Sequence, residues 1–103
     1  TVLKQATSMQ GFIVGRALDN EWEIENLVVP EAMRRRGFGS CLLQEFLLLA
    51  RGRGAKEILL EVRESNLAAR RLYEKLAFVE SGRRQSYYRE PLEDAIVYHL
   101  GLT

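Results

Sequence analysis

Seven consecutive residues of this 103-residue chain combine cations with glycines directly before an apolar helical run. They are Arg34, Arg35, Arg36, Gly37, Phe38, Gly39 and Ser40. The first amides of a helix have no intrahelical partner and, together with the helix dipole, attract anions. Gly37 and Gly39 can take a positive φ and have no Cβ, which lets a ligand oxygen approach the backbone. We therefore expect this segment, called the cradle below, to bind a phosphate or pyrophosphate.

The alternative interpretation of the cradle is a solvated, arginine-rich turn, because a G-x-G pair alone is a weak signal. Its spacing excludes two common phosphate motifs. The P-loop pattern G-x-x-x-x-G-K-[ST] does not occur, and the dinucleotide pattern G-x-G-x-x-G is interrupted by Cys41 and Leu42. A DNA-binding helix-turn-helix would need two adjacent helices, whereas we expect strands to flank the cradle and its helix.

Glu61 and Tyr73 are the residues best suited to move protons. Glu61 lies in an expected strand on the face opposite Val62, where a partly covered carboxylate can accept a proton. Tyr73 lies twelve positions later on the inward stripe of an expected helix, and its phenol can donate a proton. The structural alternative for Glu61 is a strand carboxylate paired with Arg63 or another cation. The structural alternative for Tyr73 is a side chain that only packs in the core.

Cys41 and His99 are the single cysteine and the single histidine, and they do not indicate a thiol mechanism. Cys41 falls in the first turns of an apolar helix, where we expect it to pack as a small hydrophobe, and His99 falls far away in the last expected strand. One cysteine and one histidine do not suffice for a structural zinc site, so we expect no metal. A single cysteine also fits a reducing compartment, for which the cytoplasm is the default.

The composition is that of an ordinary globular domain, with 47% hydrophobic and 28% charged residues. The formal net charge of +1 argues against bulk attraction to nucleic acid or to a membrane surface, so the arginines of the cradle must act locally. No apolar run approaches the roughly 20 residues that span a bilayer. The length predicts one domain over residues 1–103.

Hydrophobic periodicity and turn residues predict the elements that position these groups. Strands are expected at 1–6, 11–18, 21–29, 56–63, 78–86 and 95–100, and helices at 39–53 and 66–76. Asp19 and Asn20 form the turn of a hairpin, and Ser65 can cap the second helix. This order predicts a mixed α/β fold with a mostly antiparallel sheet, a central parallel pair of strands and flanking helices. Ligands of such sheets bind where the parallel strands end, which is where the cradle lies.

The cradle resembles the [RQ]-x-x-G-x-[GA] motif of the GCN5-related N-acetyltransferases (GNAT). The segments LLEVRESNLAARRLYEKLAF, RRQSYY and EDAIVYHL are similar to the RimI branch of that family, the bacterial ribosomal-protein-alanine N-acetyltransferases. The resemblance implies the GNAT acyl-CoA N-acyltransferase fold and acetyl-CoA as the co-substrate. It also implies transfer of acetyl to the N-terminal α-amino group of a protein, with a ribosomal protein as the partner.

The resemblance assigns cofactor contacts to two further parts of the chain. The pyrophosphate is expected on the amides of the cradle, and the pantetheine arm on the end of the preceding strand, at Leu27, Val28 and Val29. Asn66, at the start of the second expected helix, matches an amide side chain that contacts the cofactor. Its alternative role is a purely local one at the start of that helix. The sequence alone favours the cofactor contact and the local role equally.

The resemblance also assigns catalytic and substrate contacts. Glu61 is implied as the proton acceptor, and Tyr73 as the residue that protonates the thiolate or contacts its sulfur. Tyr87 and Tyr88, together with a proline-containing loop at 89–95, are expected to hold the peptide. The alternative for these two tyrosines is that they merely cover the sheet edge.

The match departs from the family at two places. Relatives begin with another strand and two helices before the segment matching Thr1, and those helices form one wall of the substrate groove. We therefore expect an exposed apolar sheet face that favours homodimers, and incomplete substrate recognition. Ala77 stands where relatives usually have glycine, and we expect little effect from one methyl group.

Two rival hypotheses keep the fold and the cofactor. The first is an enzyme that acetylates a small amine or a lysine side chain. The second is a truncated coenzyme A-binding module without turnover. A nucleic-acid-binding role is disfavoured by the nearly neutral net charge.

Overall fold

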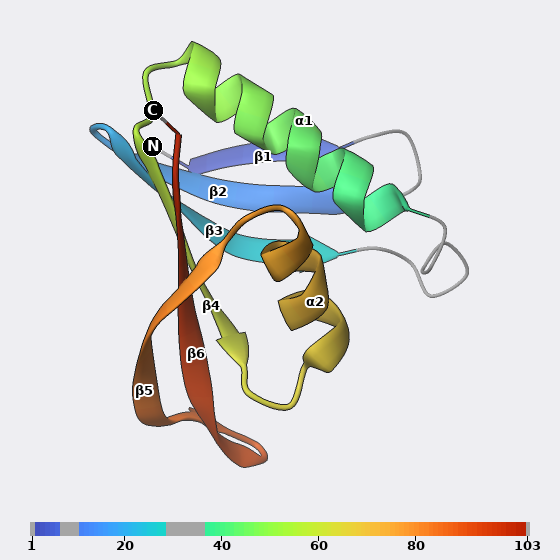
Figure 1. Ribbon diagram of the computed structural model, residues 1–103, viewed down its shortest axis with the longest axis vertical. Coiled ribbons are helices and arrows are strands. Elements are labelled where there is room, and N and C mark those ends of the chain that lie inside the picture. The colour runs from blue at the N-terminus through green and yellow to red at the C-terminus, as the bar shows by residue number, and fades with distance from the viewer. Residues whose placement is uncertain (1, 7–10, 29–36, 103) are drawn as a thin grey trace.

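The computed structural model describes residues 2–6, 11–28 and 37–102 (Figure 1). Its elements are β1 (Val2–Ala6), β2 (Phe12–Leu18), β3 (Glu21–Val28), α1 (Phe38–Gly52), β4 (Glu57–Arg63), α2 (Leu67–Lys75), β5 (Val79–Arg89) and β6 (Leu92–Gly101). The expected order of strands and helices is confirmed. The arginines of the cradle, Arg34 to Arg36, and Val29 lie outside the described residues.

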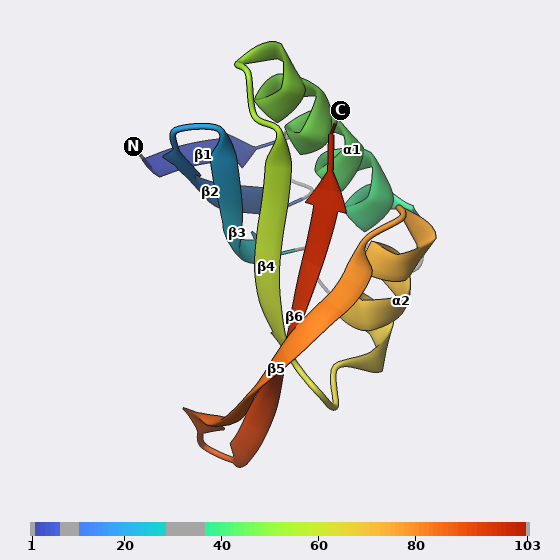
Figure 2. The same ribbon diagram turned by 60° about the vertical axis from the view of Figure 1, so that its left-hand side comes forward.

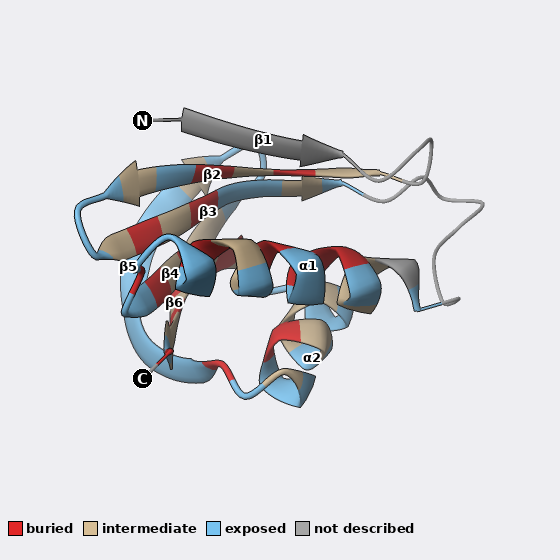
Figure 3. Ribbon diagram, turned by 90° about the horizontal axis from the view of Figure 1, so that it is seen from above, coloured by how far each residue is buried: buried red, intermediate tan, exposed pale blue. Residues whose placement is uncertain are grey.

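The described strands form a six-stranded sheet in the order β1-β2-β3-β4-β6-β5. Every neighbouring pair is antiparallel except β3 and β4, which are parallel and joined by α1. The predicted mixed α/β fold with one parallel pair is therefore confirmed. Seen from above, α1 and α2 lie on the same face of the sheet (Figure 3). The other face carries no helix among the described residues.

The parallel pair separates part-way along its length. Pairing between β3 and β4 runs from Glu21 opposite Glu57 to Ile24 opposite Leu60. A register shift between β2 and β3 leaves Glu25 without an opposite residue, and such bulges bend and twist a strand. Beyond this point β3 continues beside β2, and β4 continues beside β6 (Figure 2). The two strands thus diverge on the side of the sheet where α1 begins.

The hydrophobic core lies between the helices and one face of the sheet. The buried side chains of α1 and β4 alternate with exposed or half-buried ones, as helical and strand periodicity require. They are Leu42, Leu43, Phe46 and Ala50 in α1, and Ile58, Leu60 and Val62 in β4. The prediction that Cys41 packs in the core is wrong. Cys41 is exposed, because it lies next to this stripe and not on it.

The ends of α2 differ from the sequence-based expectation. Asn66 is the N-cap residue and its Oδ1 accepts a hydrogen bond from the Ala69 amide at 3.2 Å, so the assignment of the cap to Ser65 is wrong. Ala77 follows the helix with φ of 75°, a left-handed conformation that is unfavourable for a residue with a Cβ. The expectation that alanine has little effect there overlooked this backbone conformation.

The last two strands are longer than predicted. β5 runs to Arg89 and β6 begins at Leu92, so the expected loop at 89–95 is a tight turn followed by strand. Pro91 is accommodated because it falls in that turn and not within a ladder. Tyr87 and Tyr88 therefore lie on a strand that is paired with β6.

Candidate active site

A hollow of about 830 Å³ occupies the opening between the diverging strands. Its walls come from the ends of β3 and β4 and the starts of α1 and α2. Predicted site residues that line it are Leu27, Val28, Gly37, Gly39, Ser40, Glu61, Asn66, Tyr73 and Tyr88. Leu27 and Tyr88, 61 positions apart in sequence, are brought together here by the parallel pairing and by the crossover helix.

The start of α1 forms one end of this larger hollow. Gly37 is the N-cap with φ of 80°, and no side chain caps the helix. The Cys41 amide donates a helical hydrogen bond to the Gly37 carbonyl at 3.0 Å. The amides of the residues before Cys41 lie in the first turn, where they have no partner within the helix and where helices bind anions. Among the described residues, no atom lies within 4 Å of the position that a Cβ on Gly37 would take, so this side of the turn is open. The first turn contains no acidic residue that would repel a phosphate.

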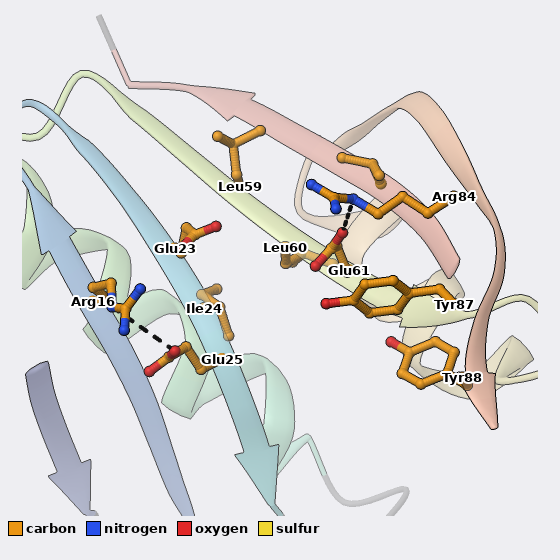
Figure 4. A pocket seen from close by; sticks show the side chains of 11 residues that line it. Arg16, Glu23, Ile24, Glu25, Leu59, Leu60, Glu61, Arg84, Tyr87 and Tyr88 are labelled. Atoms are coloured by element: carbon orange, nitrogen blue, oxygen red, sulfur yellow. Dashed lines mark ion pairs between the residues drawn. The ribbon is translucent and has the colours of Figure 1, made fainter. Parts of the chain in front are cut away.

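Glu61 lies on β4 just beyond the last residue paired with β3. Its side chain is 26% exposed and forms an ion pair with Arg84 of β5 through Oε2 (Figure 4). That oxygen is buried and has no hydrogen bond of good geometry among the described residues. The structural alternative of a carboxylate paired with a cation is thus realised, although with Arg84 and not with Arg63. Arg84 was not predicted as a partner of Glu61, because its position beside Glu61 depends on the order of β4, β6 and β5.

Glu61 also lines a second, smaller hollow of about 450 Å³ on the helix-free face of the sheet (Figure 4). Arg16 and Glu25 form an exposed ion pair at 4.0 Å along one of its walls. Tyr87 and Tyr88 contribute the opposite wall. Because Glu61 contributes to both hollows, a molecule in the smaller one can reach the same carboxylate as a molecule in the larger one.

Tyr73 points from α2 into the core and lines the larger hollow. It is 7% exposed, and its ring packs against Phe78 and Tyr98 at centroid distances of 5.6 and 6.1 Å. Burial, with a smaller contribution from Tyr88, raises the pKa of the Tyr73 phenol to about 12. Tyr73 therefore carries its proton throughout the neutral pH range.

Tyr87 and Tyr88 both extend toward Glu61 from β5 (Figure 4). Their rings are in edge contact at 5.2 Å, and the guanidinium of Arg63 lies 4.3 Å from the centre of the Tyr88 ring. Burial raises the pKa of Tyr88, and the negative charge of Glu61 adds to that effect. Tyr88 lines both hollows, whereas Tyr87 lines the smaller one.

The remaining candidate residues lie away from the centre of the site. His99 contacts Glu57 at 3.1 Å near the opposite end of β4. Within residues 2–6, 11–28 and 37–102, no three His, Cys, Asp or Glu side chains are grouped as metal ligands would be. None of the helices in that part of the chain is long and apolar enough to cross a membrane.

Comparison with known proteins identifies the family. The model of the family described as "Acetyltransferase (GNAT) family" matches residues 2–78. The chain belongs to the GNAT acetyltransferase family. Among its GNAT relatives is the [ribosomal protein bS18]-alanine N-acetyltransferase of Escherichia coli (strain K12). It is 35% identical over 103 residues, which cover 98% of this chain and 70% of the relative.

Solved structures agree with this membership. The ribosomal-protein-S18-alanine N-acetyltransferase from Escherichia coli aligns with a TM-score of 0.88 and 33% identity, over 99% of this chain and 70% of that one. A structure of the NatC complex bound to Gag peptide and CoA aligns with a TM-score of 0.84 and 29% identity, over 91% of this chain and 62% of that one. The GNAT fold inferred from the sequence is therefore confirmed.

Proposed function

We propose that this GNAT protein transfers the acetyl group of acetyl-CoA to the N-terminal α-amino group of a protein. The observation that carries the proposal is the position of Glu61, which lines a hollow on each side of the divergence between β3 and β4. One hollow can take the cofactor and the other the acceptor. Two carboxylates, Glu61 and Glu25, line both hollows, and Glu61 is the less exposed of them, at 26% against 41%. Similarity to the bS18-alanine N-acetyltransferase favours an N-terminal alanine of a ribosomal protein as the acceptor, and hence the cytoplasm as the location.

The lining of the larger hollow offers the groups that would bind acetyl-CoA. Its α1 end offers main-chain amides at Gly39 and Ser40 for the diphosphate, with open space in front of Gly37. The edge of β3 from Leu27 to Val28 has no strand partner on its β4 side among the described residues, and it can hydrogen-bond the amides of the pantetheine arm. A solved relative, the NatC complex, was crystallised with CoA and a peptide together. Bound acetyl-CoA would supply the acetyl group as an activated thioester.

The acceptor amine must lose a proton for the reaction to proceed. An α-amino group has a pKa near 8, against about 10.4 for a lysine side chain, so a carboxylate is a sufficient base at neutral pH. Glu61 lines both hollows and can accept this proton at its side-chain oxygens, directly or through water. The Arg84 guanidinium holds that carboxylate in place in the free protein.

The departing sulfur needs a proton or a hydrogen bond. The Tyr73 phenol lines the larger hollow and remains protonated, because its pKa is raised to about 12. A backbone amide near Val28 can polarise the acyl carbonyl. Tyr87 and Tyr88 can hold the backbone of the acceptor peptide in the smaller hollow.

The test is acetylation of peptides by the full chain, followed by mass spectrometry. We expect a peptide that begins with alanine to gain one acetyl group at its α-amine. The same peptide with a blocked N-terminus and a free lysine should not react. Acetylation of the lysine peptide or of small amines alone would instead support the first rival enzyme activity.

Calorimetry with coenzyme A tests the second rival hypothesis, a cofactor-binding module without turnover. Tight binding of coenzyme A without turnover of any amine would support a cofactor-binding module. The single-domain organisation and the homodimer expected from the sequence stay predictions, which size-exclusion chromatography with light scattering would check.

A further inference from the structure

β5 contains an irregularity next to the proposed acceptor site. Arg84 is opposite Ala95, and Tyr88 is opposite Glu93, so β5 advances by four residues where β6 advances by two. In a regular ladder Ser86, and not Tyr88, would stand opposite Glu93. The two additional residues therefore bring the Tyr87 and Tyr88 rings together on the face that carries Glu61 (Figure 4).

This irregular backbone needs compensation to persist. Ser86 has φ of 51°, in the left-handed region that is unfavourable for serine. Its amide also has no ladder partner, because the registered pairs pass from Arg84 to Tyr88. Such a conformation persists only where surrounding contacts stabilise it.

The carboxylate of Asp94 supplies those contacts. Its Oδ1 accepts a hydrogen bond from the Ser86 amide at 2.8 Å, and its Oδ2 accepts one from Nη1 of Arg83 at 2.7 Å. Nη2 of Arg83 in turn donates to Oε2 of Glu64 at 2.6 Å. The Ser86 amide and then Arg83 lower the pKa of Asp94, so it remains a carboxylate at neutral pH. A single side chain of β6 thus holds the irregular part of β5, and Arg83 links the same cluster to Glu64, directly after β4.

We infer that Asp94 is a positioning residue for acceptor binding, because it holds the irregularity of β5 that aims Tyr87 and Tyr88 at the acceptor site. The inference rests on the proposed function. Asp94 lines neither hollow and acts only through the strand. Without its carboxylate, the Ser86 amide loses its partner and β5 can relax toward the regular register, which moves the tyrosine rings away from Glu61.

The first test compares steady-state kinetics of the wild type and Asp94→Ala. We expect KM for the acceptor peptide to rise by roughly tenfold or more, while KM for acetyl-CoA stays within about twofold. Glu80→Ala is the matched control, because it removes an exposed β5 ion pair, with Arg70 at 3.4 Å, that is distant from the tyrosines. The control should leave both constants unchanged. An unchanged peptide KM in Asp94→Ala would overturn the inference.

A double-mutant cycle distinguishes positioning from general destabilisation. In a background that carries both Tyr87→Ala and Tyr88→Ala, Asp94→Ala should cost little further peptide affinity, because the two rings that it positions are already missing. Full additivity of the two losses would overturn the inference. If Asp94→Ala does not fold, Asp94→Asn replaces it, since its amide oxygen can still accept from Ser86 while the charge toward Arg83 is lost. Its peptide KM should lie between those of the wild type and Tyr88→Ala, and a wild-type value would count against the inference.

A readout without turnover keeps the inference separate from the proposed function. In NMR spectra, Asp94→Ala should show faster hydrogen exchange at the Ser86 amide and loss of the contact between Tyr88 and Arg63. Unchanged exchange and an unchanged contact would overturn the inference even if the enzyme is active. If the wild type acetylates no amine but these NMR changes occur, the proposed function fails and the structural role of Asp94 remains.

Discussion

Glu61 and Tyr73 line the same hollow from different elements, a strand and a helix, but only Glu61 also reaches the hollow on the helix-free face. A proton acceptor is thus accessible to both proposed substrates, whereas a proton donor with a raised pKa faces only the proposed cofactor site. This asymmetry matches the two proton transfers that acetylation of an amine requires.

Glu61→Gln should lower kcat by about 10²-fold or more, because an amide of nearly the same shape cannot accept the proton of the amine. Binding of acetyl-CoA should stay unchanged. Initial rates with an alanine peptide measure the effect. Glu57→Gln is the control, since Glu57 is an exposed carboxylate of the same strand that contacts His99 away from the site. Equal turnover of Glu61→Gln and wild type would disprove the base assignment.

Tyr73→Phe should lower kcat by roughly 10²-fold if the phenol donates a proton, with little change in either KM. The same variant has a pH signature in stability. Since the pKa of Tyr73 rises from 10.0 to about 12 on folding, the neutral phenol favours the folded state below pH 10, and this contribution is lost as the pH rises toward 12.

The wild type should accordingly lose about 2 kcal/mol more stability than Tyr73→Phe between neutral pH and pH 12. Urea denaturation of both proteins at a series of pH values measures the difference. The other tyrosines with raised pKa values, Tyr88 and Tyr98, are present in both proteins and cancel. Parallel pH curves for the two proteins would show that Tyr73 is not desolvated in solution.

Asn66→Ser separates the two roles of Asn66. Serine retains a capping oxygen, so the free energy of unfolding should change by no more than about 0.5 kcal/mol. Loss of the amide should weaken binding of coenzyme A by roughly fivefold if Asn66 contacts the cofactor. Calorimetry measures this affinity. Asn66→Ala should lose both the helix cap and the cofactor contact. If Asn66→Ser binds coenzyme A as tightly as the wild type, capping is the role of Asn66.

Gly15→Ala should destabilise the protein by about 1–3 kcal/mol through overpacking. A Cβ at residue 15 would lie 2.5 Å from Cζ of the buried Phe46 ring and 3.2 Å from the Glu23 carbonyl oxygen. Gly82→Ala is the control, because the nearest atom to its Cβ in the described part of the chain would be the Val97 Cβ at 4.0 Å. Denaturant unfolding of both variants checks the prediction, which fails if the two behave alike.

Ala77→Gly should stabilise the protein by about 0.5–1 kcal/mol, because φ of 75° is unfavourable for alanine and glycine adopts it readily. The same substitution at Ala68, which is exposed in α2, should instead lower stability by up to about 1 kcal/mol. Thermal unfolding of the pair provides the measurement. A loss of stability in both variants would contradict the left-handed conformation of Ala77.

Most of the fold was predictable because it depends on local patterns. Alternating apolar residues identified β2, β3 and β4, and helical spacing identified the stripe of α1 that contains Phe46. The errors also have local causes. Ser65 and Asn66 are both good capping residues, so composition could not choose between them. Alanine itself does not indicate a left-handed conformation at residue 77, and the glycine that relatives usually have there was the available signal.

The type and order of the elements, and the residues with suitable chemistry, were predictable from the chain alone, because both follow from neighbours within a few positions. The sequence placed Glu61 on the strand face opposite Val62 and glycines at the start of α1. The tertiary structure decided which of these groups meet. The divergence of β3 from β4, the contact of Arg84 with Glu61, and the irregular register that aims Tyr88 depend on pairing between distant strands. No local pattern encodes such pairing, because its free energy arises only when the whole sheet has formed.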